Sequence, residues 1–470
     1  MASLRNNSWW FLPILPFALL LYVVLKFSVP VPFLDEWDLV PLLQKMYGGN
    51  LALADLWTLH NEHRLLFPQA IMLGLARLTD WNIRYEMAAS VMLAVGIFAL
   101  LTCQVLITAR KLSAPQLRWA VPFFSLIVFS ISQYQNWLWG WQLQILLSVF
   151  AVTAGIVLLA NPPFSWVRFI GAGLLGVVAS YSFGNGGVFW LTGLLILFLV
   201  LEPGKERAVR LALWIVFTSL TMGIYFYHYE RLEEHPPLTL LFSQPLQYLA
   251  YIFKYIGNIC AQYASRDSSI EGGFAFFYGL IGIAILVWAV LAFRKTKLVS
   301  WTTLAPALGL CCFSIGSAMV VGIGRVGLGT DQAASSRYCT VTVPFWASLV
   351  MMLMILQLET KGKSKMRLTG QRTAAQWFLG IITILLVFGS LMAINGAVRM
   401  STGQEVGRKT LLMIPVQVTK GVDYRGISAL HPNGQLVLDR FPFLKEHRLT
   451  VFREEPLAGE NPKSESQNKP

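Results

Sequence analysis

Charge is scarce in this sequence. Asp, Glu, Lys and Arg make up 13% of the 470 residues, whereas 55% are hydrophobic. Soluble domains carry roughly 25% charged residues, and the apolar residues here gather in repeated runs of about twenty, the length that crosses a bilayer. The low charge argues against an ordinary soluble enzyme and predicts an all-α, multi-pass membrane protein.

Cysteine is also rare, and glycine-rich phosphate-binding motifs are missing. The five cysteines lack the spacing of metal ligands, so we predict neither a zinc site nor a required disulfide. The sequence has no glycine-rich loop of the Walker type, and the predicted cytoplasmic loops are too short for an ATPase domain, which excludes a nucleotide-driven pump. The net charge of +13 is dispersed over short breaks between apolar runs, where topology and anionic lipids explain it without nucleic acid.

Hydropathy predicts a bundle of about eleven transmembrane helices. They are placed at residues 9–31, 85–108, 119–132, 138–159, 167–182, 188–201, 208–229, 274–293, 300–323, 338–358 and 376–395. The first run is too long for a signal-peptide core, so we expect it to be retained. The apolar segment Leu65 to Thr79 is short and contains Pro68 and Arg77, so we expect it to lie flat or to dip without crossing.

Basic residues set the predicted orientation, because Lys and Arg near a span stay on the cytoplasmic side. Successive clusters, such as Arg110-Lys111, Arg168 and Lys205-Arg207-Arg210, are each two crossings from the next, so they share one side with the N-terminus. The C-terminus is then extracytoplasmic. We expect three regions: a polytopic membrane domain at 1–395 with its first outer loop at 32–84, a small extracytoplasmic region at 396–459 with a turn and strand near 431–438, and a disordered tail at 460–470.

Two acids, Asp35 and Glu36, directly follow the first apolar run. The residues after them fit an interfacial helix that begins near Val40, because Pro41 is tolerated only in a first turn. Such a helix would hold the acids near the bilayer surface, where a carboxylate can deprotonate an acceptor hydroxyl. Asp35 is the first candidate for this catalytic base and Glu36 the second; the alternative is a solvated acidic turn that caps the helix.

The stretch His60-Asn61-Glu62-His63-Arg64 is a second candidate site. Arg64 can hold a phosphate through its planar guanidinium, and His60, Glu62 and His63 can orient a substrate. The histidine spacing permits a divalent metal, but without further clustered ligands we assign no cofactor. The alternative is a set of interfacial anchors for the segment that follows.

Three later outer segments carry further candidates for substrate binding. Gln133 and Asn136 lie in a tryptophan-rich break that suits a carbohydrate lining, although an aromatic belt explains the tryptophans equally well. Asn185 lies in a glycine-rich break between two short spans. Arg337 and Tyr338 stand at the mouth of a span, where Arg337 can bind a lipid phosphate or extend to ordinary phospholipid.

The acidic pair Asp35-Glu36 after the first span, the interfacial outer loop and the multi-pass layout resemble the GT-C superfamily of polyprenyl-phosphate-sugar glycosyltransferases. This superfamily includes protein mannosyltransferases and the aminoarabinose transferases of lipid A. The resemblance implies a GT-C-like fold, Asp35 as the base, an undecaprenyl-phosphate-type donor, inverting transfer and a place in the bacterial inner membrane. Those relatives often carry a His-Pro-Pro stretch after the acidic pair, which this chain lacks.

These features together predict an enzyme that moves a sugar from a polyprenyl-phosphate donor to a glycan, lipid or protein hydroxyl at the outer face of the membrane. Two alternatives remain open at this point. One is a polymerase or ligase of the O-antigen type, which uses lipid-pyrophosphate glycans. The other is a lipid or sugar transporter, for which ionisable residues deep within the spans or inverted repeats are typical.

Overall fold

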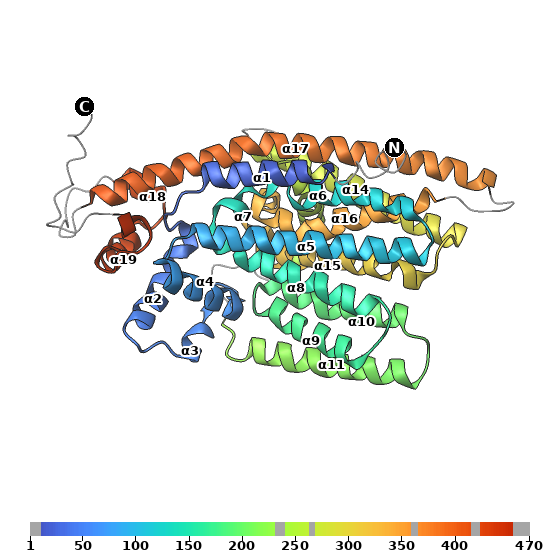
Figure 1. Cartoon of the computed structure of the whole chain (residues 1–470), viewed down its shortest axis with the longest axis horizontal. Helices are drawn as coiled ribbons and strands as arrows, with labels where there is room; N and C mark the ends of the chain where they lie inside the picture. Colours follow the sequence, from blue (N-terminus) through green and yellow to red (C-terminus); the bar gives the residue numbers. More distant parts are fainter. Residues whose placement is uncertain (1–10, 231–239, 263–267, 359–364, 415–423, 455–470) are drawn as a thin grey trace, which may run out of the picture.

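The computed structural model describes residues 11–230, 240–262, 268–358, 365–414 and 424–454. Long helices run side by side along the longest axis of the molecule (Figure 1). Seven of the described helices are long and apolar enough to cross a membrane. They are α5 (Arg84–Lys111), α8 (Leu143–Ala160, with the turn before it), α11 (Lys205–Phe226), α14 (Ser268–Thr296), α15 (Trp301–Arg325), α16 (Cys339–Leu356) and α17 (Lys365–Met413).

Shorter helices complete the bundle. They are α1 (Ile14–Phe27), α6 (Ala120–Val128), α7 (Tyr134–Leu138), α9 (Trp166–Ser180), α10 (Val188–Val200), α12 (Leu240–Ser243) and α13 (Pro245–Gly257). Each of the eleven predicted spans coincides with a helix, so the predicted all-α membrane fold is confirmed. The number eleven is not, because the helices in several of those spans are shorter than a full crossing.

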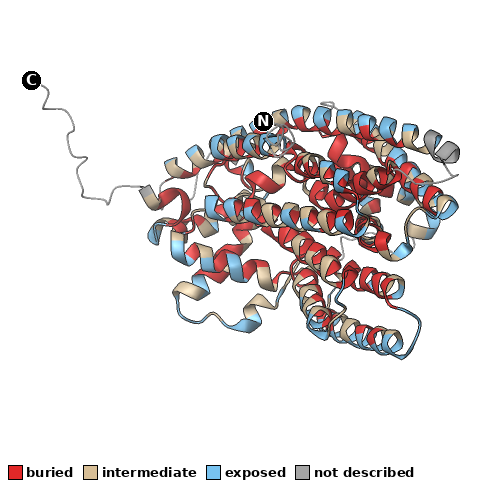
Figure 2. Cartoon of the chain, turned by 45° about the vertical axis from the view of Figure 1, so that its right-hand side comes forward, coloured by how far each residue is buried: buried red, intermediate tan, exposed pale blue. Residues whose placement is uncertain are grey.

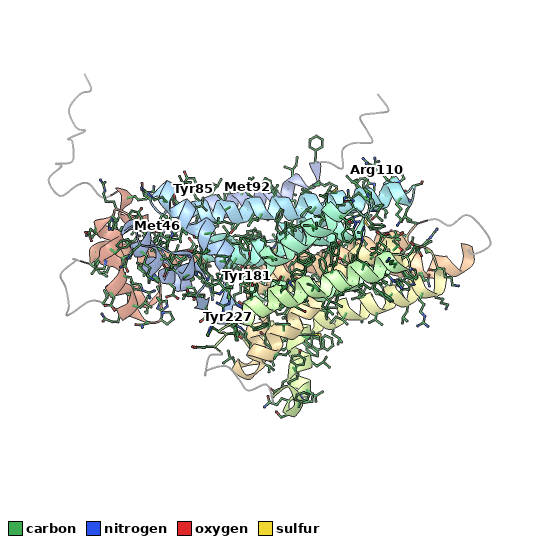
Figure 3. All side chains as sticks on the ribbon, turned by 90° about the horizontal axis from the view of Figure 1, so that it is seen from below. Met46, Tyr85, Met92, Arg110, Tyr181 and Tyr227 are labelled. Carbon is green, nitrogen blue, oxygen red and sulfur yellow. The ribbon has the colours of Figure 1, made fainter. Side chains whose placement is uncertain are left out.

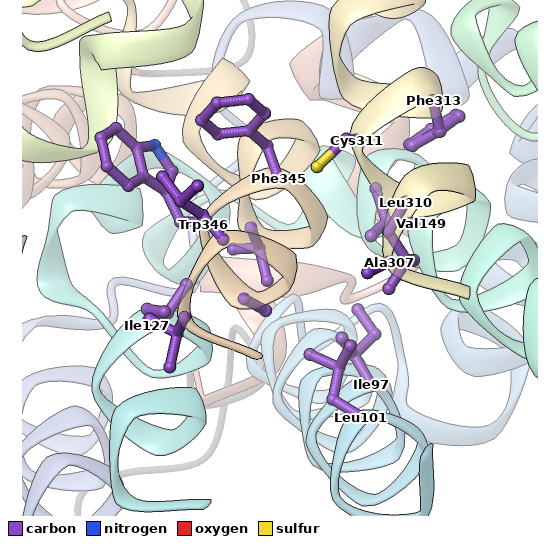
Figure 4. Close-up of a cluster of buried hydrophobic side chains, with 14 of the residues drawn as sticks. Ile97, Leu101, Ile127, Val149, Ala307, Leu310, Cys311, Phe313, Phe345 and Trp346 are labelled. Atoms are coloured by element: carbon purple, nitrogen blue, oxygen red, sulfur yellow. The ribbon is translucent and has the colours of Figure 1, made fainter. Parts of the chain in front are cut away.

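The core of the bundle surrounds α16, in which every residue except Met354 is buried. Trp346 and Phe345 of this helix belong to a buried apolar cluster to which α5, α6, α8 and α15 also contribute (Figure 4). Buried residues occupy the interior and exposed residues the outward faces (Figure 2). Many exposed side chains are large and apolar, such as Leu213 and Leu220 of α11, as expected for helices that face lipid.

The first outer loop forms one end of the molecule. It contains the 3₁₀ helix η3 (Leu34–Leu39), α2 (Val40–Tyr47), α3 (Leu53–Leu56), the strands β1 (Leu59–His60) and β2 (His63–Arg64), and α4 (Leu66–Thr79). The predicted start of α2 at Val40 is confirmed, with Pro41 in the first turn. In Figure 1, α4 lies among these elements rather than along the bundle, as expected of a segment that does not cross. Met46 and Tyr85 lie at this end and Arg110 at the other (Figure 3).

Helix α17 continues past the predicted domain boundary at residue 395. The last predicted span ends at Asn395, but the helix continues without a break to Met413 and has 49 residues. At 1.5 Å per residue it is roughly 70 Å long, more than twice the hydrocarbon thickness of a bilayer. The hydropathy signal ended where polar residues begin, whereas helix propensity and packing continue beyond them.

The C-terminal region contains α18 (Tyr424–Ser428), α19 (Gly434–Glu446) and the 3₁₀ helix η12 (Thr450–Glu454). The strand expected after the turn at residue 431 is wrong, since the Asn433 side chain caps a helix by accepting a hydrogen bond from the Leu436 backbone. This region shares a hydrophobic core with the first outer loop, in which Trp37 and Phe441 are buried. The predicted disordered tail at 460–470 lies outside the described residues.

Candidate active site

The first outer loop presents its polar residues on a short hairpin. Strands β1 and β2 pair antiparallel, with Leu59 opposite Arg64 and His60 opposite His63. Asn61 in the two-residue turn has a positive φ of 51°, a conformation that asparagine tolerates better than most residues. The hairpin therefore fixes His60 and His63 side by side on one short element.

Asp35 lies at the surface of this loop and faces His60. Its Oδ2 atom is 3.8 Å from His60 Nε2, and its side chain is 34% exposed. Burial alone would raise the pKa of the Asp35 carboxyl, but the neighbouring His60, together with the charges of Arg337 and His431, holds the pKa below its usual value. Asp35 is thus an ionised and accessible carboxylate, as a general base must be.

Glu36 points the other way and is buried. Its carboxylate accepts hydrogen bonds from the backbone N–H groups of Phe33, at 2.8 Å, and Trp141, at 3.1 Å. Burial and the neighbouring Glu86 carboxyl raise the pKa of Glu36 well above its usual value. These contacts fix the backbone on both sides of Asp35, so the geometry suits a positioning role better than the second-base role expected for Glu36.

A cavity of about 480 Å³ opens beside the hairpin. Its apolar wall includes Phe226 and the last turns of α15, and its polar groups come from the hairpin, the turn before α10 and the end of α11. The lining residues are Glu62, His63, Phe183, Gly184, Asn185, Tyr225, Phe226, Tyr229, Val320, Val321, Ile323, Gly324, Arg325 and Tyr338. This mixture of an apolar wall and a few convergent polar groups is typical of a ligand site.

Glu62 and Arg325 form an ion pair inside this cavity, 2.5 Å apart. Burial raises the pKa of Glu62, but the charges of His63 and Arg325 outweigh it and lower the pKa to about 2. Burial is the main reason why the pKa of His63 falls to about 4. His63 is therefore neutral at ordinary pH, and its buried Nδ1 atom has no hydrogen-bond partner among the described residues.

Arg337 is the cation in this region whose charge is not neutralised. Within the described part of the chain its guanidinium forms neither a hydrogen bond nor an ion pair, and the Nε atom is buried. The guanidinium lies over the ring of Tyr338, 5.2 Å from its centroid. Its charge acts on the pKa values of both Asp35 and His63, so it lies near the candidate base and near one residue of the cavity lining.

Gln133 and Asn136 do not line the cavity. Gln133 accepts a hydrogen bond from the Thr340 hydroxyl at 2.6 Å, and Asn136 donates to the Arg337 carbonyl at 2.9 Å. Gln135, between them, accepts from the Arg337 backbone N–H at 3.0 Å. These amides hold the segment that carries Arg337.

Asn185 and Tyr338 do line the cavity, as expected. The Asn185 amide donates to the Tyr255 hydroxyl at 3.3 Å, and the Tyr255 ring stacks on Tyr338 with centroids 5.0 Å apart. Gly184 precedes Asn185 at a point where a Cβ atom would lie 2.6 Å from His63 Nδ1. The glycine-rich break thus brings backbone close to the histidine, which a larger residue would prevent.

Arg64 is placed differently from the prediction. Its guanidinium is buried and donates to the backbone carbonyls of Trp57, Tyr225 and Tyr227, while lying over the Trp57 ring. All three guanidinium nitrogens are used, and Arg64 does not line the cavity. Through these contacts Arg64 connects the hairpin to the end of α11.

Sequence reasoning gave no role to Arg325, Tyr225 or Tyr229, which line the cavity. Arg325 ends an apolar helix, and a basic residue at that position is the one signal that could have pointed to it. The two tyrosines looked like ordinary members of an interfacial belt. Their pairing with the hairpin depends on contacts between segments about 160 residues apart, which no local pattern reveals.

The histidines do not form a shared metal site with the nearby acids. The two ring nitrogens of His60 face different carboxylates, Asp35 and Asp38, so one ion could not bind His60 and both acids. Across the described ranges, no group of three or more His, Cys, Asp or Glu side chains is placed to hold a metal ion.

No protein-family model matches this sequence, and no curated protein matches it. Two crystal structures of ArnT from Cupriavidus metallidurans are similar in fold. The structure bound to undecaprenyl phosphate is 14% identical with a TM-score of 0.43, and the match covers 94% of this chain and 78% of that one. The apo structure is 12% identical with a TM-score of 0.48, covering 93% and 88%. At this level of similarity, neither match carries anything about the reaction of this chain.

Proposed function

We propose that this chain is a membrane glycosyltransferase that moves a sugar from a polyprenyl-phosphate donor to an acceptor hydroxyl at the outer face of a bacterial inner membrane. Asp35 is the general base, and the cavity beside the hairpin receives the donor. The N-terminus lies in the cytoplasm and the C-terminus outside, as the positive-inside rule requires. The acceptor is a glycan, lipid or protein that approaches Asp35 from the solvent side.

In the proposed reaction, the acceptor hydroxyl oxygen attacks the anomeric carbon of the sugar while Asp35 takes the hydroxyl proton. The bond between the anomeric carbon and the phosphate oxygen breaks, and polyprenyl phosphate leaves with the electron pair of that bond. A single displacement of this kind inverts the anomeric centre. Arg337 stabilises the negative charge that develops on the departing phosphate.

The observation that carries this proposal is the guanidinium of Arg337. A partly buried arginine normally has an anionic or carbonyl partner, because the unpaired charge is costly. Here that partner is lacking among the described residues, and the guanidinium lies near both an ionised carboxylate and a cavity with an apolar wall. A phosphate attached to an isoprenoid chain complements both features.

The charges also bear on the alternatives. Arg325 is neutralised by Glu62, so one cationic group in the described cavity region remains for the donor. That count fits a monophosphate better than a pyrophosphate, for which two clamping cations are more suitable. A transporter would not need an ionised base such as Asp35 at the outer rim.

The test is sugar transfer by purified protein in lipid nanodiscs, with a panel of polyprenyl-phosphate sugars and matched pyrophosphate donors. We expect transfer from a monophosphate donor by the wild type and a loss of at least a hundredfold in Asp35→Asn. Asp55→Asn is the matched control, since Asp55 lies in the same loop, contacts Lys45 and should leave transfer unchanged. Transfer retained by Asp35→Asn would show that Asp35 is not the general base. Activity with pyrophosphate donors alone would favour the polymerase or ligase.

A further inference from the structure

A second polar cavity lies at the same end of the bundle, apart from the candidate active site. Its volume is about 250 Å³, and it shares no lining residue with the larger cavity. It lies where the end of α1, the start of α5, α17 and η12 meet. The lining residues are Ser28, Val29, Pro30, Asn82, Arg84, Glu405, Arg408, Thr450, Val451 and Arg453.

Positive charge dominates this cavity. Three arginines, Arg84, Arg408 and Arg453, face one acid, Glu405. Arg408 pairs with Glu405 through two hydrogen bonds of 2.7 and 2.8 Å, and Lys409 adds a further positive charge 3.9 Å from the same carboxylate. Arg408 is therefore the main partner of this acid, although the charge of Arg84 also helps to lower the pKa of Glu405. Within the described residues, neither Arg84 nor Arg453 forms an ion pair with Glu405.

Those two arginines come from different elements. Arg84 donates one hydrogen bond, to the Ser28 carbonyl at 3.1 Å, and no carboxylate of the described residues is within ion-pair distance of it. In the same part of the chain, the Arg453 side chain makes neither a hydrogen bond nor an ion pair. Arg84 also begins α5, whose 28 residues direct the positive end of the helix dipole at this place.

Two hydrogen bonds of Thr450 hold the segments that surround this cavity together. The Thr450 hydroxyl donates to the Pro30 carbonyl at 2.9 Å, and the Thr450 backbone N–H donates to the Asp80 carbonyl at 2.9 Å. These bonds hold η12, and with it Arg453, against the segments before α2 and after α4. Thr450 has a positive φ of 51°, unusual for a β-branched residue, so the local backbone is constrained by these contacts.

We infer that this cavity binds a phosphate group. Arginines from separate elements that converge on a polar space recognise phosphate oxygens by charge-assisted hydrogen bonds. The volume is enough for a phosphate and its immediate substituent but small for a lipid chain, and the cavity lies where the apolar helix α1 ends and α5 begins, a place that suits a headgroup. The phosphate is that of an anionic lipid headgroup or free phosphate. The inference does not depend on the proposed transferase reaction.

The experiment uses the full chain in nanodiscs of phosphatidylcholine. Inorganic phosphate is titrated against thermal unfolding, since a ligand that binds the folded state raises the melting temperature with concentration. In parallel, native mass spectrometry measures retention of phosphatidylglycerol against phosphatidylcholine. We expect the double variant Arg84→Gln/Arg453→Gln to weaken binding of the retained probe about tenfold or more. Arg294→Gln, which removes an exposed arginine outside the cavity, is the control for lost charge.

Glu405→Gln is a variant for which the expected change in binding has the opposite sign. Loss of the acid leaves the cavity more positive, so phosphate or phosphatidylglycerol should bind more tightly, even if the double variant fails to fold. Phosphatidylglycerol retention without a phosphate effect identifies the headgroup as the source, and the reverse identifies free phosphate. The inference is overturned if neither probe binds, or if Glu405→Gln does not tighten binding and the folded double variant behaves like Arg294→Gln.

Discussion

His60 and His63 lie opposite each other in a two-residue hairpin, yet their rings contact different groups. His60 lies between Asp35 and Asp38 and packs edge-on against Trp141, with centroids 4.9 Å apart. His63 packs against Phe183 and lines the cavity. The hairpin therefore links the candidate base to the candidate donor cavity through one turn of backbone, so that neither can shift far without the other.

Replacement of Arg337 by Gln should change the pH dependence of transfer. The positive charge of Arg337 helps to lower the pKa of Asp35, so its loss should raise that pKa and move the acidic limb of the pH–rate profile to higher pH. The rate at the pH optimum should fall roughly 10- to 100-fold with the lost charge-assisted contact to phosphate. Initial rates between pH 4 and 8 measure both effects.

Arg337→Lys is the informative companion variant. It keeps the charge, so the acidic limb should stay near its wild-type position, while the loss of the planar guanidinium should still reduce the rate. An acidic limb that does not move in Arg337→Gln would mean that this arginine does not act on the base.

Gly140→Ala should destabilise the protein and reduce transfer. A Cβ atom at residue 140 would lie 2.4 Å from Glu86 Oε2 and 2.9 Å from Glu36 Oε1, and both carboxyls are buried. Overpacking of this kind costs about 1–3 kcal/mol, and displacement of Glu36 would disturb the backbone of Asp35. Gly74→Ala is the matched control, since nothing lies within 4 Å of its added methyl group, and alanine favours the helix. Melting temperatures in detergent that fall equally for both variants would contradict this explanation.

His63 should make folding stability depend on pH. Its folded pKa of about 4 lies below the ordinary value of 6.5, so between these values the unfolded chain binds a proton that the folded chain does not. The contribution of His63 is therefore greatest above pH 6.5 and declines by about 1–3 kcal/mol as the pH falls toward 4. The melting temperature of wild type minus that of His63→Gln, measured from pH 7 to pH 4.5, should decrease in this interval. A constant difference would show that the imidazole is not held neutral.

Glu62→Gln should lower the unfolding free energy, because it leaves Arg325 without its ion-pair partner. The ion pair lies mostly buried in the cavity, and removal of the carboxylate leaves the guanidinium without its partner. We expect a loss of about 1–3 kcal/mol in unfolding free energy, and tighter binding of anionic lipids in the cavity because a second cation becomes available. The double variant Glu62→Gln/Arg325→Met should lose less than the sum of the single variants. Strict additivity would mean that the two side chains are independent.

The positions of the helices could be predicted from the sequence because lipid requires about twenty apolar residues for each crossing. The acids of the first outer loop were also visible, since charged residues stand out against an apolar background. Asp35, Glu62, His63, Asn185, Arg337 and Tyr338 are the candidates that the structure places at or near the cavity.

The partners of those residues could not be predicted in the same way. Glu36 and Arg64 looked as reactive as Asp35, but their roles are set by backbone groups far away in the sequence, such as the Trp141 amide and the Tyr225 carbonyl. Arg325 ends an apolar helix, and its pairing with Glu62 of the hairpin could not be predicted from that position. The residues before α19 resemble a hairpin turn in sequence, so a strand was expected after them. The Asn433 side chain instead caps the first turn of a helix there.

Because α17 is one unbroken helix from the bundle to the C-terminal region, where it packs on α18 and η12, it sets the position and rotation of that region relative to the bundle. Each residue added to or removed from the part of α17 between the bundle and its contacts with α18 and η12 would move the surface on which they pack by 1.5 Å and turn it by about 100°. Such a change would break the contacts of Arg440 with Trp37 and Asp38, 2.6 and 2.7 Å long, that join α19 to the first outer loop. The number of residues in this helix, more than their identity, therefore sets how α19 is aligned with the segment that contains Trp37 and Asp38.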